Sequence, residues 1–146
     1  MKGSILLVVI LLILVGILIL LNNSKIRRPL PVEMRPSPVH GRGIFACEFI
    51  PKDTVIETAP LITFNRQELS PDSKIRLYDI AYKDGASAVM LGYASIYNHS
   101  DSNNAYWYFD ENDEIIYIKS NKDIHPDEEV FVNYGPNYWK SKNNKV

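Results

Sequence analysis

The sequence divides into one long apolar segment and a longer part in which short apolar stretches alternate with polar turns. Residues 5–21 carry no charge, and only Gly16 interrupts their apolar side chains. With Ser4 the segment has 18 residues, which as a helix just crosses the ~30 Å hydrocarbon layer of a membrane. A secretory signal peptide has a shorter apolar region and a small-residue cleavage site, which residues 22–24 do not provide. Residues 1–24 are therefore predicted to form a retained transmembrane anchor.

Charges on either side of this segment predict its orientation. Lys2 precedes it, whereas Lys25, Arg27 and Arg28 follow it. Positively charged flanks prefer the cytosolic side of a membrane. We therefore expect a single-pass membrane protein whose C-terminal part faces the cytosol.

The part that follows begins with a proline-rich linker and continues as short strands. Residues 25–38 contain four prolines, which prevent a helix, so we expect an extended linker that enters a first strand. Apolar stretches bounded by turn residues then predict strands at Ile44–Phe49, Thr54–Thr63, Glu114–Lys119 and around the alternating positions Val130, Val132 and Tyr134.

One further segment has the period of a helix. Ser70 is a suitable N-cap, and Pro71 suits the first helical position. Ile75, Tyr78 and Tyr82 would then share one face. The whole pattern predicts a mainly β domain with a small helical insert.

Length and composition limit the class of protein further. Without the apolar segment about 120 residues remain, enough for one compact domain. A formal net charge of -1 argues against direct nucleic-acid binding, which usually requires a basic excess. The single cysteine, Cys47, excludes an internal disulfide and a cysteine-based zinc site. Nine tyrosines, five phenylalanines and two tryptophans supply core area, and such rings can also line a pocket for a cation.

Two clusters of candidate functional residues lie in the first two thirds of the domain. Gly41 and Gly43 flank a single residue, so the backbone there either makes a plain β-turn or comes close to a ligand. Asn98 and His99 lie in a stretch too hydrophobic for an ordinary surface loop. They belong either to a buried hydrogen-bond network or to a binding site. His99 has no second histidine or cysteine nearby, so a metal site is not expected there.

The third cluster lies close to the C-terminus. Asp127, Glu128 and Glu129 precede a predicted strand and are typical of a solvated turn. Tyr134 ends that strand immediately before Gly135. Its ring either joins the core or points its hydroxyl into a pocket.

In order and spacing, the three clusters resemble the SET-domain family. The family has Gly-x-Gly near the start, then Asn-His-Ser, then an acidic turn followed by a strand that ends in tyrosine. The similarity covers residues 32–135, followed by a short tail at 136–146. The segments Gly-Tyr-Ala-Ser-Ile-Tyr-Asn-His-Ser and Val-Asn-Tyr-Gly look especially like the minimal SET proteins of bacteria and large viruses. The resemblance implies a β-clip-like SET fold in which the C-terminal segment threads a loop to form a pseudoknot.

The same resemblance implies a protein-lysine methyltransferase that uses S-adenosyl-L-methionine as methyl donor. Tyr134 falls on the catalytic hydroxyl of the family. The implied cofactor-binding residues are Gly41, Arg42, Gly43, Asn98, His99 and Tyr134.

The resemblance also indicates which residues would line the channel for the substrate lysine: Tyr97, Trp107, Val132, Tyr138 and Trp139. For Tyr97 and Trp107 an ordinary core role is equally open. Val132 stands where relatives often have an aromatic ring, which leaves the number of transferred methyl groups open.

One departure from the family concerns zinc. Many relatives have a cysteine directly after Asn-His-Ser, which completes a zinc site with a cysteine-rich tail. Here that position is Asp101, and residues 136–146 contain no cysteine, so no metal is expected.

Two classes of function are compatible with these residues. One is an active methyltransferase whose partner is a protein with an accessible lysine. The other is a catalytically silent SET-like binding or scaffold module at a membrane. Retention of Tyr134 favours the enzyme, because a silent module has no need of its hydroxyl. The methyl donor is a cytosolic metabolite, which agrees with the expected orientation, and the sequence leaves the oligomeric state open.

Overall fold

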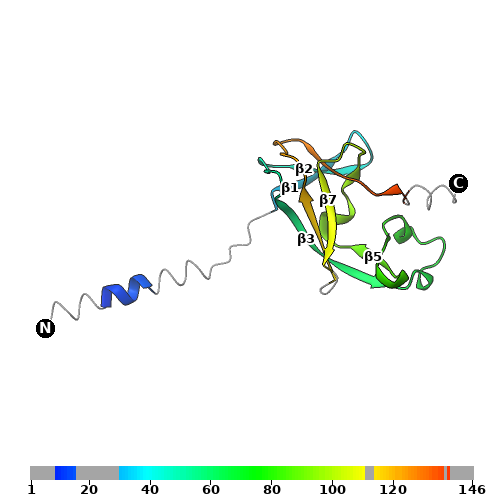
Figure 1. Ribbon diagram of the computed structural model, residues 1–146, viewed down its shortest axis with the longest axis horizontal. Helices are drawn as coiled ribbons and strands as arrows, with labels where there is room; N and C mark the ends of the chain where they lie inside the picture. Colours follow the sequence, from blue (N-terminus) through cyan, green and yellow to red (C-terminus); the bar gives the residue numbers. More distant parts are fainter. Residues whose placement is uncertain (1–8, 16–29, 111–113, 137, 139–146) are drawn as a thin grey trace.

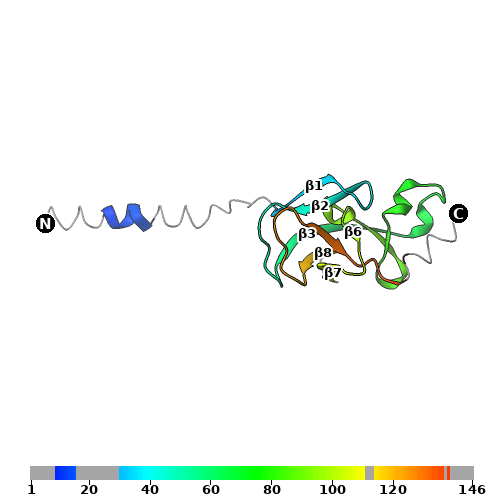
Figure 2. The ribbon, with the colours of Figure 1, turned by 90° about the horizontal axis from the view of Figure 1, so that it is seen from above.

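The computed structural model of the chain describes residues 9–15, 30–110, 114–136 and 138. From residue 30 onward, these residues form two β-sheets connected by turns and 3₁₀ helices (Figure 1). One sheet has the strand order β1-β2-β9-β6, and the other has the order β4-β5-β3-β8-β7. In Figure 2, β1 and β2 lie on the opposite side of the domain from β7 and β8.

The elements are short. The first sheet contains β1 (Val32–Pro36), β2 (Arg42–Ala46), β6 (Asn98–His99) and β9 (Glu129–Val132). The second contains β3 (Val55–Phe64), β4 (Ile80–Ala81), β5 (Ser87–Met90), β7 (Ala105–Asp110) and β8 (Ile115–Ser120). The 3₁₀ helices of the described chain are η1 (Arg66–Glu68), η2 (Lys74–Leu77), η3 (Lys83–Gly85) and η4 (Gly92–Ser95).

The strand regions predicted from alternating apolar residues are confirmed, with ends shifted by up to a few residues. They correspond to β2, β3, β8 and β9. In β8, Ile116, Ile118 and Ser120 are buried, while the residues between them are only partly covered. Because successive side chains of a strand point to opposite faces, this alternation places the isoleucines in the core between the sheets. Val130 and Val132 of β9 are fully buried in the same core.

The proline-rich segment enters the first strand as predicted. Val32–Pro36 forms β1, which pairs antiparallel with β2 at the edge of its sheet. An edge position suits Pro36, because proline has no N–H to give to a neighbouring strand. Residues 25–29 of the expected linker lie outside the described residues.

The helix predicted from Ser70 onward is wrong. The segment instead forms turns and the four-residue 3₁₀ helix η2, whose N-cap is Ser73. Of the predicted apolar face, Ile75 is 49 % and Tyr78 50 % exposed, whereas Tyr82 is partly buried and packs against the core. A helix this short is marginal in water unless packing stabilises one face, and η2 contains no buried residue.

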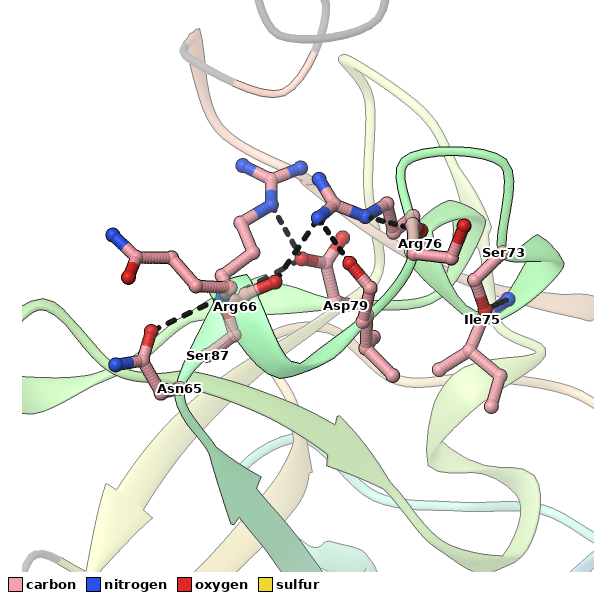
Figure 3. A network of polar contacts seen from close by, with 10 residues as sticks. Asn65, Arg66, Ser73, Ile75, Arg76, Asp79 and Ser87 are labelled. Carbon is pink, nitrogen blue, oxygen red and sulfur yellow. Dashed lines mark hydrogen bonds and ion pairs between the residues drawn. The ribbon is translucent and has the colours of Figure 1, made fainter.

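Side chains, rather than a helical ladder, organise this insert, defined here as residues 65–86. The guanidinium of Arg76 donates hydrogen bonds to the carbonyl oxygens of Arg66, Leu69 and Ser70, at 3.0, 2.6 and 2.9 Å (Figure 3). Asp79, whose side chain is 3 % exposed, pairs with Arg66 Nε at 3.0 Å. The Arg76 side chain thus donates hydrogen bonds to carbonyl oxygens that in an α-helix would accept them from backbone N–H groups.

Most of the predicted transmembrane anchor at residues 1–24 lies outside the described residues. Residues 9–15 are helical, and Val9 to Val15 have exposed side chains. Within the described part of the chain, no helix has the length and apolar character that spanning a membrane requires.

Candidate active site

Strand β9 brings the three candidate clusters together. It pairs antiparallel with β2, where Ile44 lies opposite Val130. On its other side it pairs parallel with β6, where Asn98 lies opposite Phe131 and His99 opposite Val132. The glycine turn before β2, the Asn-His pair and the end of β9 therefore lie side by side, although they are far apart in the sequence.

Asn98 connects the glycine cluster to β9. Its amide nitrogen Nδ2 donates to the carbonyl oxygens of His40 and Arg42, at 3.2 and 3.1 Å, and to Glu129 Oε1 at 2.8 Å. The side chain is buried, so these bonds compensate for its loss of water. The sequence left a hydrogen-bond network and a binding site as alternatives, and this network is present. It also presents two backbone carbonyls of the glycine turn at one point.

The Glu129 side chain packs against this turn. It is 8 % exposed, and its second oxygen accepts a hydrogen bond from Ser37 Oγ at 2.9 Å. A Cβ on Gly43 would lie 2.0 Å from Glu129 Oε1 and 3.1 Å from Asn98 Nδ2, so any other residue there would displace the Glu129 carboxylate. The solvated-turn prediction holds for Asp127 and Glu128, which are exposed, but is wrong for Glu129.

The turn itself is open on its other side. Gly41 has a φ of +51°, and an added Cβ would meet nothing within 4 Å. Its carbonyl oxygen accepts the Ser37 N–H at 3.0 Å, which closes the connection between β1 and β2. Gly41 therefore belongs to the bend that joins β1 to β2, and it leaves space beside the backbone.

Tyr134 is held at both ends by the Asn-His segment. Its backbone N–H donates to His99 Nδ1 at 3.1 Å, and its hydroxyl donates to the Tyr97 carbonyl oxygen at 2.7 Å. Burial of the phenol, together with nearby Tyr138, raises the pKa of Tyr134 to about 12. The phenol is therefore neutral at physiological pH.

The hydrogen bond from the Tyr134 N–H also determines the tautomer of a neutral His99. Because Nδ1 accepts a hydrogen bond, a neutral His99 carries its proton on Nε2. That nitrogen lies 3.3 Å from Asp101 Oδ1. Asp101, which stands where many relatives have a zinc-ligating cysteine, is thus an acceptor for the histidine.

Aromatic rings surround Tyr134. The ring of Trp107 stacks parallel to it, with centroids 5.9 Å apart and an interplanar angle of 6°. The Tyr138 ring lies 4.5 Å away at 58°. The electron-rich faces of such rings favour a cation placed over them. Two of the predicted channel residues, Trp107 and Tyr138, therefore lie beside the predicted catalytic residue.

The other channel candidates lie elsewhere. Tyr97 is 1 % exposed, and its hydroxyl bonds to Glu57 in the core, so it contributes its backbone carbonyl rather than its ring. Val132 is fully buried. Trp139 lies outside the described residues. Among the residues that are described, no three His, Cys, Asp or Glu side chains gather as metal ligands would.

The residues of this site suit the predicted methyl donor. The carbonyls of His40 and Arg42 with the Asn98 carboxamide offer acceptors for an ammonium group. The absence of side chains at Gly41 and Gly43 allows a ligand to approach the backbone. A separate cavity of about 280 Å³, lined by Leu30, Val32, Glu57, Gly92 and Tyr93, contains none of the predicted donor-binding residues.

Comparison with known proteins adds the family. Residues 41–135 match the model of the SET domain. A curated relative from Schizosaccharomyces pombe, a histone-lysine N-methyltransferase specific for H3 lysine-37, is 31 % identical over 112 residues. This similarity covers 75 % of the present chain and 76 % of the relative.

Solved structures agree with this match. A Plasmodium falciparum protein described as a candidate histone methyltransferase superimposes with a TM-score of 0.66 and 25 % identity, over 76 % of this chain and 98 % of that one. The methyltransferase domain of human PR domain-containing protein 2 gives a TM-score of 0.54 at 20 % identity, over 71 % of this chain and 76 % of that one. The second likeness supports the fold alone.

Proposed function

The chain belongs to the SET-domain family, and we propose that it transfers a methyl group from S-adenosylmethionine to the side-chain amine of a lysine in a protein. One observation carries this proposal beyond family membership. The Tyr134 hydroxyl lies 2.7 Å from the Tyr97 carbonyl, directly before the Asn-His pair. The phenol of Tyr134 is thus bonded to the residue that directly precedes the predicted donor-binding pair, Asn98 and His99.

The proposed chemistry needs little from the protein beyond placement. S-adenosylmethionine supplies a methyl group that is bonded to a positively charged sulfur. A neutral amine attacks the methyl carbon in line with this bond and displaces the sulfur. The glycine turn and Asn98 bind the donor. Because the Tyr134 proton is given to the Tyr97 carbonyl, the phenol oxygen acts toward other groups as an acceptor, and it orients the amine. Alignment of the reacting atoms accounts for much of the acceleration in such reactions.

The substrate lysine must lose a proton before it reacts. Its ordinary pKa is ~10.4, so almost all of it is an ammonium at neutral pH. A site walled by Trp107 and Tyr138 withholds water from the ammonium and favours the neutral amine. The same ring faces stabilise positive charge as it passes from sulfur to nitrogen.

The proposed acceptor is a lysine on a protein, and a histone is the first substrate to test. The Schizosaccharomyces pombe relative is named for a lysine of histone H3. Its similarity extends over three quarters of both chains, so the comparison is between proteins of similar extent.

We further propose that residues 1–24 anchor the enzyme in a membrane with the SET domain in the cytosol. The support is the uncharged apolar run and the basic residues Lys25, Arg27 and Arg28 that follow it. Protease protection of the full chain in sealed membranes tests this placement. Cleavage of the domain only from the side opposite the cytosol would contradict it.

The methyltransferase proposal is tested with Tyr134→Phe in the full chain purified in detergent. Transfer of radiolabelled methyl to a peptide array that includes histone sequences is expected to fall by about 10²–10⁴-fold. Calorimetry should show that donor binding changes little, because the ring and its backbone bond to His99 remain.

Tyr117→Phe is the matched control. Tyr117 lies on β8, where its ring stacks on Tyr108 rather than on any predicted site residue. This variant should retain full transfer. A wild-type chain that binds S-adenosylmethionine but methylates no peptide would favour the silent binding module instead.

A further inference from the structure

A buried carboxylate that the proposed mechanism does not use lies behind the site. Glu57 of β3 is 4 % exposed. No basic side chain forms an ion pair with it within the described part of the chain. Burial raises the pKa of the Glu57 carboxyl, while hydrogen bonds from the Tyr93 and Ala94 backbone and from the Tyr97 hydroxyl oppose that rise. A carboxyl in this position costs free energy, so a specific role for it is worth seeking.

Glu57 is enclosed by the turn η4. Its Oε1 accepts the Tyr93 N–H at 2.8 Å. Gly92 has a φ of +67°, and an added Cβ there would lie 2.5 Å from the same oxygen. The turn therefore folds directly over the carboxyl, and glycine at position 92 makes this approach possible.

The second carboxyl oxygen holds the far end of the same segment. Glu57 Oε2 accepts the Tyr97 hydroxyl at 3.0 Å. One side chain thus fixes residues 93 and 97, which begin and end a single loop. The loop then continues directly into Asn98 and His99 of β6.

The end of this loop touches the predicted catalytic residue. The backbone carbonyl of Tyr97 accepts the Tyr134 hydroxyl at 2.7 Å. Any rotation of the Tyr97 peptide would move the acceptor that determines where the phenol proton points. Glu57 bonds to the hydroxyl of the same residue but does not touch Tyr134 itself.

We propose that Glu57 is a positioning residue for methyl transfer: through Tyr93 and Tyr97 it fixes the carbonyl that orients the Tyr134 hydroxyl. The inference rests on the proposed function. Glu57 does not act as a proton carrier. Its task is to form two hydrogen bonds at a defined separation, and a neutral side chain of the same shape performs most of it.

The first test compares Glu57→Gln with Glu57→Ala in the full chain. Glutamine keeps an oxygen for the Tyr93 N–H and offers an amide to the Tyr97 hydroxyl, whereas alanine keeps neither bond. For Glu57→Ala we expect kcat to fall by about 30-fold or more, with the Kd for S-adenosylmethionine changed by less than about threefold. Glu57→Gln should recover kcat to within about fivefold of the wild type.

A second variant covers the case in which Glu57→Ala fails to fold. Tyr97→Phe removes only the bond to Glu57 Oε2 and keeps the ring in the core, so we expect kcat to fall by about three- to tenfold. Ser120→Ala is the matched structural control. Ser120 is fully buried and donates to the Pro51 carbonyl far from the site, so its loss should lower the melting temperature without lowering kcat.

A spectroscopic readout separates this inference from the proposed function. In protein labelled with ¹³C at tyrosine Cζ, the Tyr134 resonance is identified by its absence from Tyr134→Phe. We expect this resonance to shift in Tyr97→Phe and in Glu57→Ala and to stay in place in Ser120→Ala. This result can be obtained even if the wild type methylates no substrate.

Three outcomes would overturn the inference. The first is an unchanged kcat in folded Glu57→Ala and Tyr97→Phe. The second, for a chain without activity, is a Tyr134 resonance that does not respond to either variant. The third is a fall in kcat that Ser120→Ala reproduces at an equal loss of stability, which would reduce Glu57 to a structural residue.

Discussion

The catalytic region and the insert are built in different ways from the same chain. Around β6 and β9, backbone pairing on both sides of one strand combines with the buried carboxylate of Glu129, both of whose oxygens are hydrogen-bonded. In residues 65–86, one ion pair and one arginine carry the organisation, and Ile75, Leu77 and Tyr78 face solvent. The difference predicts that substitutions around β6 and β9 disturb the proposed donor site more than substitutions in the insert do.

The largest effect is expected from Gly43→Ala in the catalytic region. The new Cβ would lie 2.0 Å from Glu129 Oε1, so the carboxylate must give up its bonds to Asn98 and Ser37. We expect a loss of about 2–4 kcal/mol in the free energy of unfolding and no measurable donor binding. Urea denaturation and calorimetry measure both.

Gly85→Ala in the insert is the matched control for this prediction. Gly85 has a φ of +78° with open space around the missing Cβ, so only backbone strain of roughly 1–2 kcal/mol applies. Donor binding should be retained. Equal effects of the two substitutions on donor affinity would remove the contrast between the regions.

The pH dependence of transfer gives the next largest effect. Burial raises the pKa of Tyr134 to about 12, so the phenol stays neutral up to about pH 10, and the substrate amine is the group that titrates. Below its pKa of ~10.4, the neutral fraction of a lysine rises about tenfold per pH unit. Initial rates of methyl transfer at low substrate concentration should therefore rise about a hundredfold between pH 7 and pH 9.

Stability should respond to alkali in the opposite direction. A folded-state pKa above the ordinary value of 10.0 means that protonated Tyr134 stabilises the fold. This contribution is complete below pH 10 and is lost as the pH rises towards 12. The melting temperature of Tyr134→Phe should fall less over this window than that of the wild type.

For the pH dependence of transfer, a rate that levels off below pH 8 would show that a protein group, not the substrate amine, limits transfer.

A smaller effect is expected from Asp79→Asn in the insert. The substitution removes the charge that pairs with Arg66, but Arg66 is 43 % exposed, which limits the loss to about 1–2 kcal/mol. Faster hydrogen exchange in residues 66–79 with unchanged donor affinity would agree with a loosened insert beside an intact site. Asp72→Asn, which changes an exposed carboxylate of the same segment, should alter neither.

The smallest effect is expected from Ser73→Ala. Its hydroxyl caps η2 by accepting the Ile75 N–H at a distance of 3.4 Å. The loss should be about 0.5 kcal/mol in urea denaturation, at the weak end for an N-cap. A loss above about 1.5 kcal/mol would mean that the insert is more cooperative with the domain than its contacts indicate.

The sequence predicted the strands, and the three segments that β9 brings together, better than it predicted the insert. Alternation identified β3, β8 and β9 because their inward side chains are apolar. The helix prediction failed because an amphipathic helix is stable only where its apolar face packs against another part of the protein. The exposed Ile75 lacks such packing, and Arg76 bonds to carbonyls across the turn.

Two of the buried carboxylates, those of Glu129 and Glu57, were harder to find. Nothing local distinguishes Glu129 from the exposed Asp127 and Glu128, because its burial depends on Asn98 and Ser37 from distant segments. Glu57 did leave a signal. It shares a strand face with Ala59 and Leu61, both buried, so alternation alone places it inward.

The pairing of β9 with β2 and β6 has a consequence for the protein during its synthesis. Asn98 and the glycine turn are synthesised before Phe131 and Tyr134, with which they later pair or bond. Pairings of such long sequence separation form late and slowly. A polypeptide that ends before β9 therefore carries most of the proposed donor-binding residues without the phenol of Tyr134.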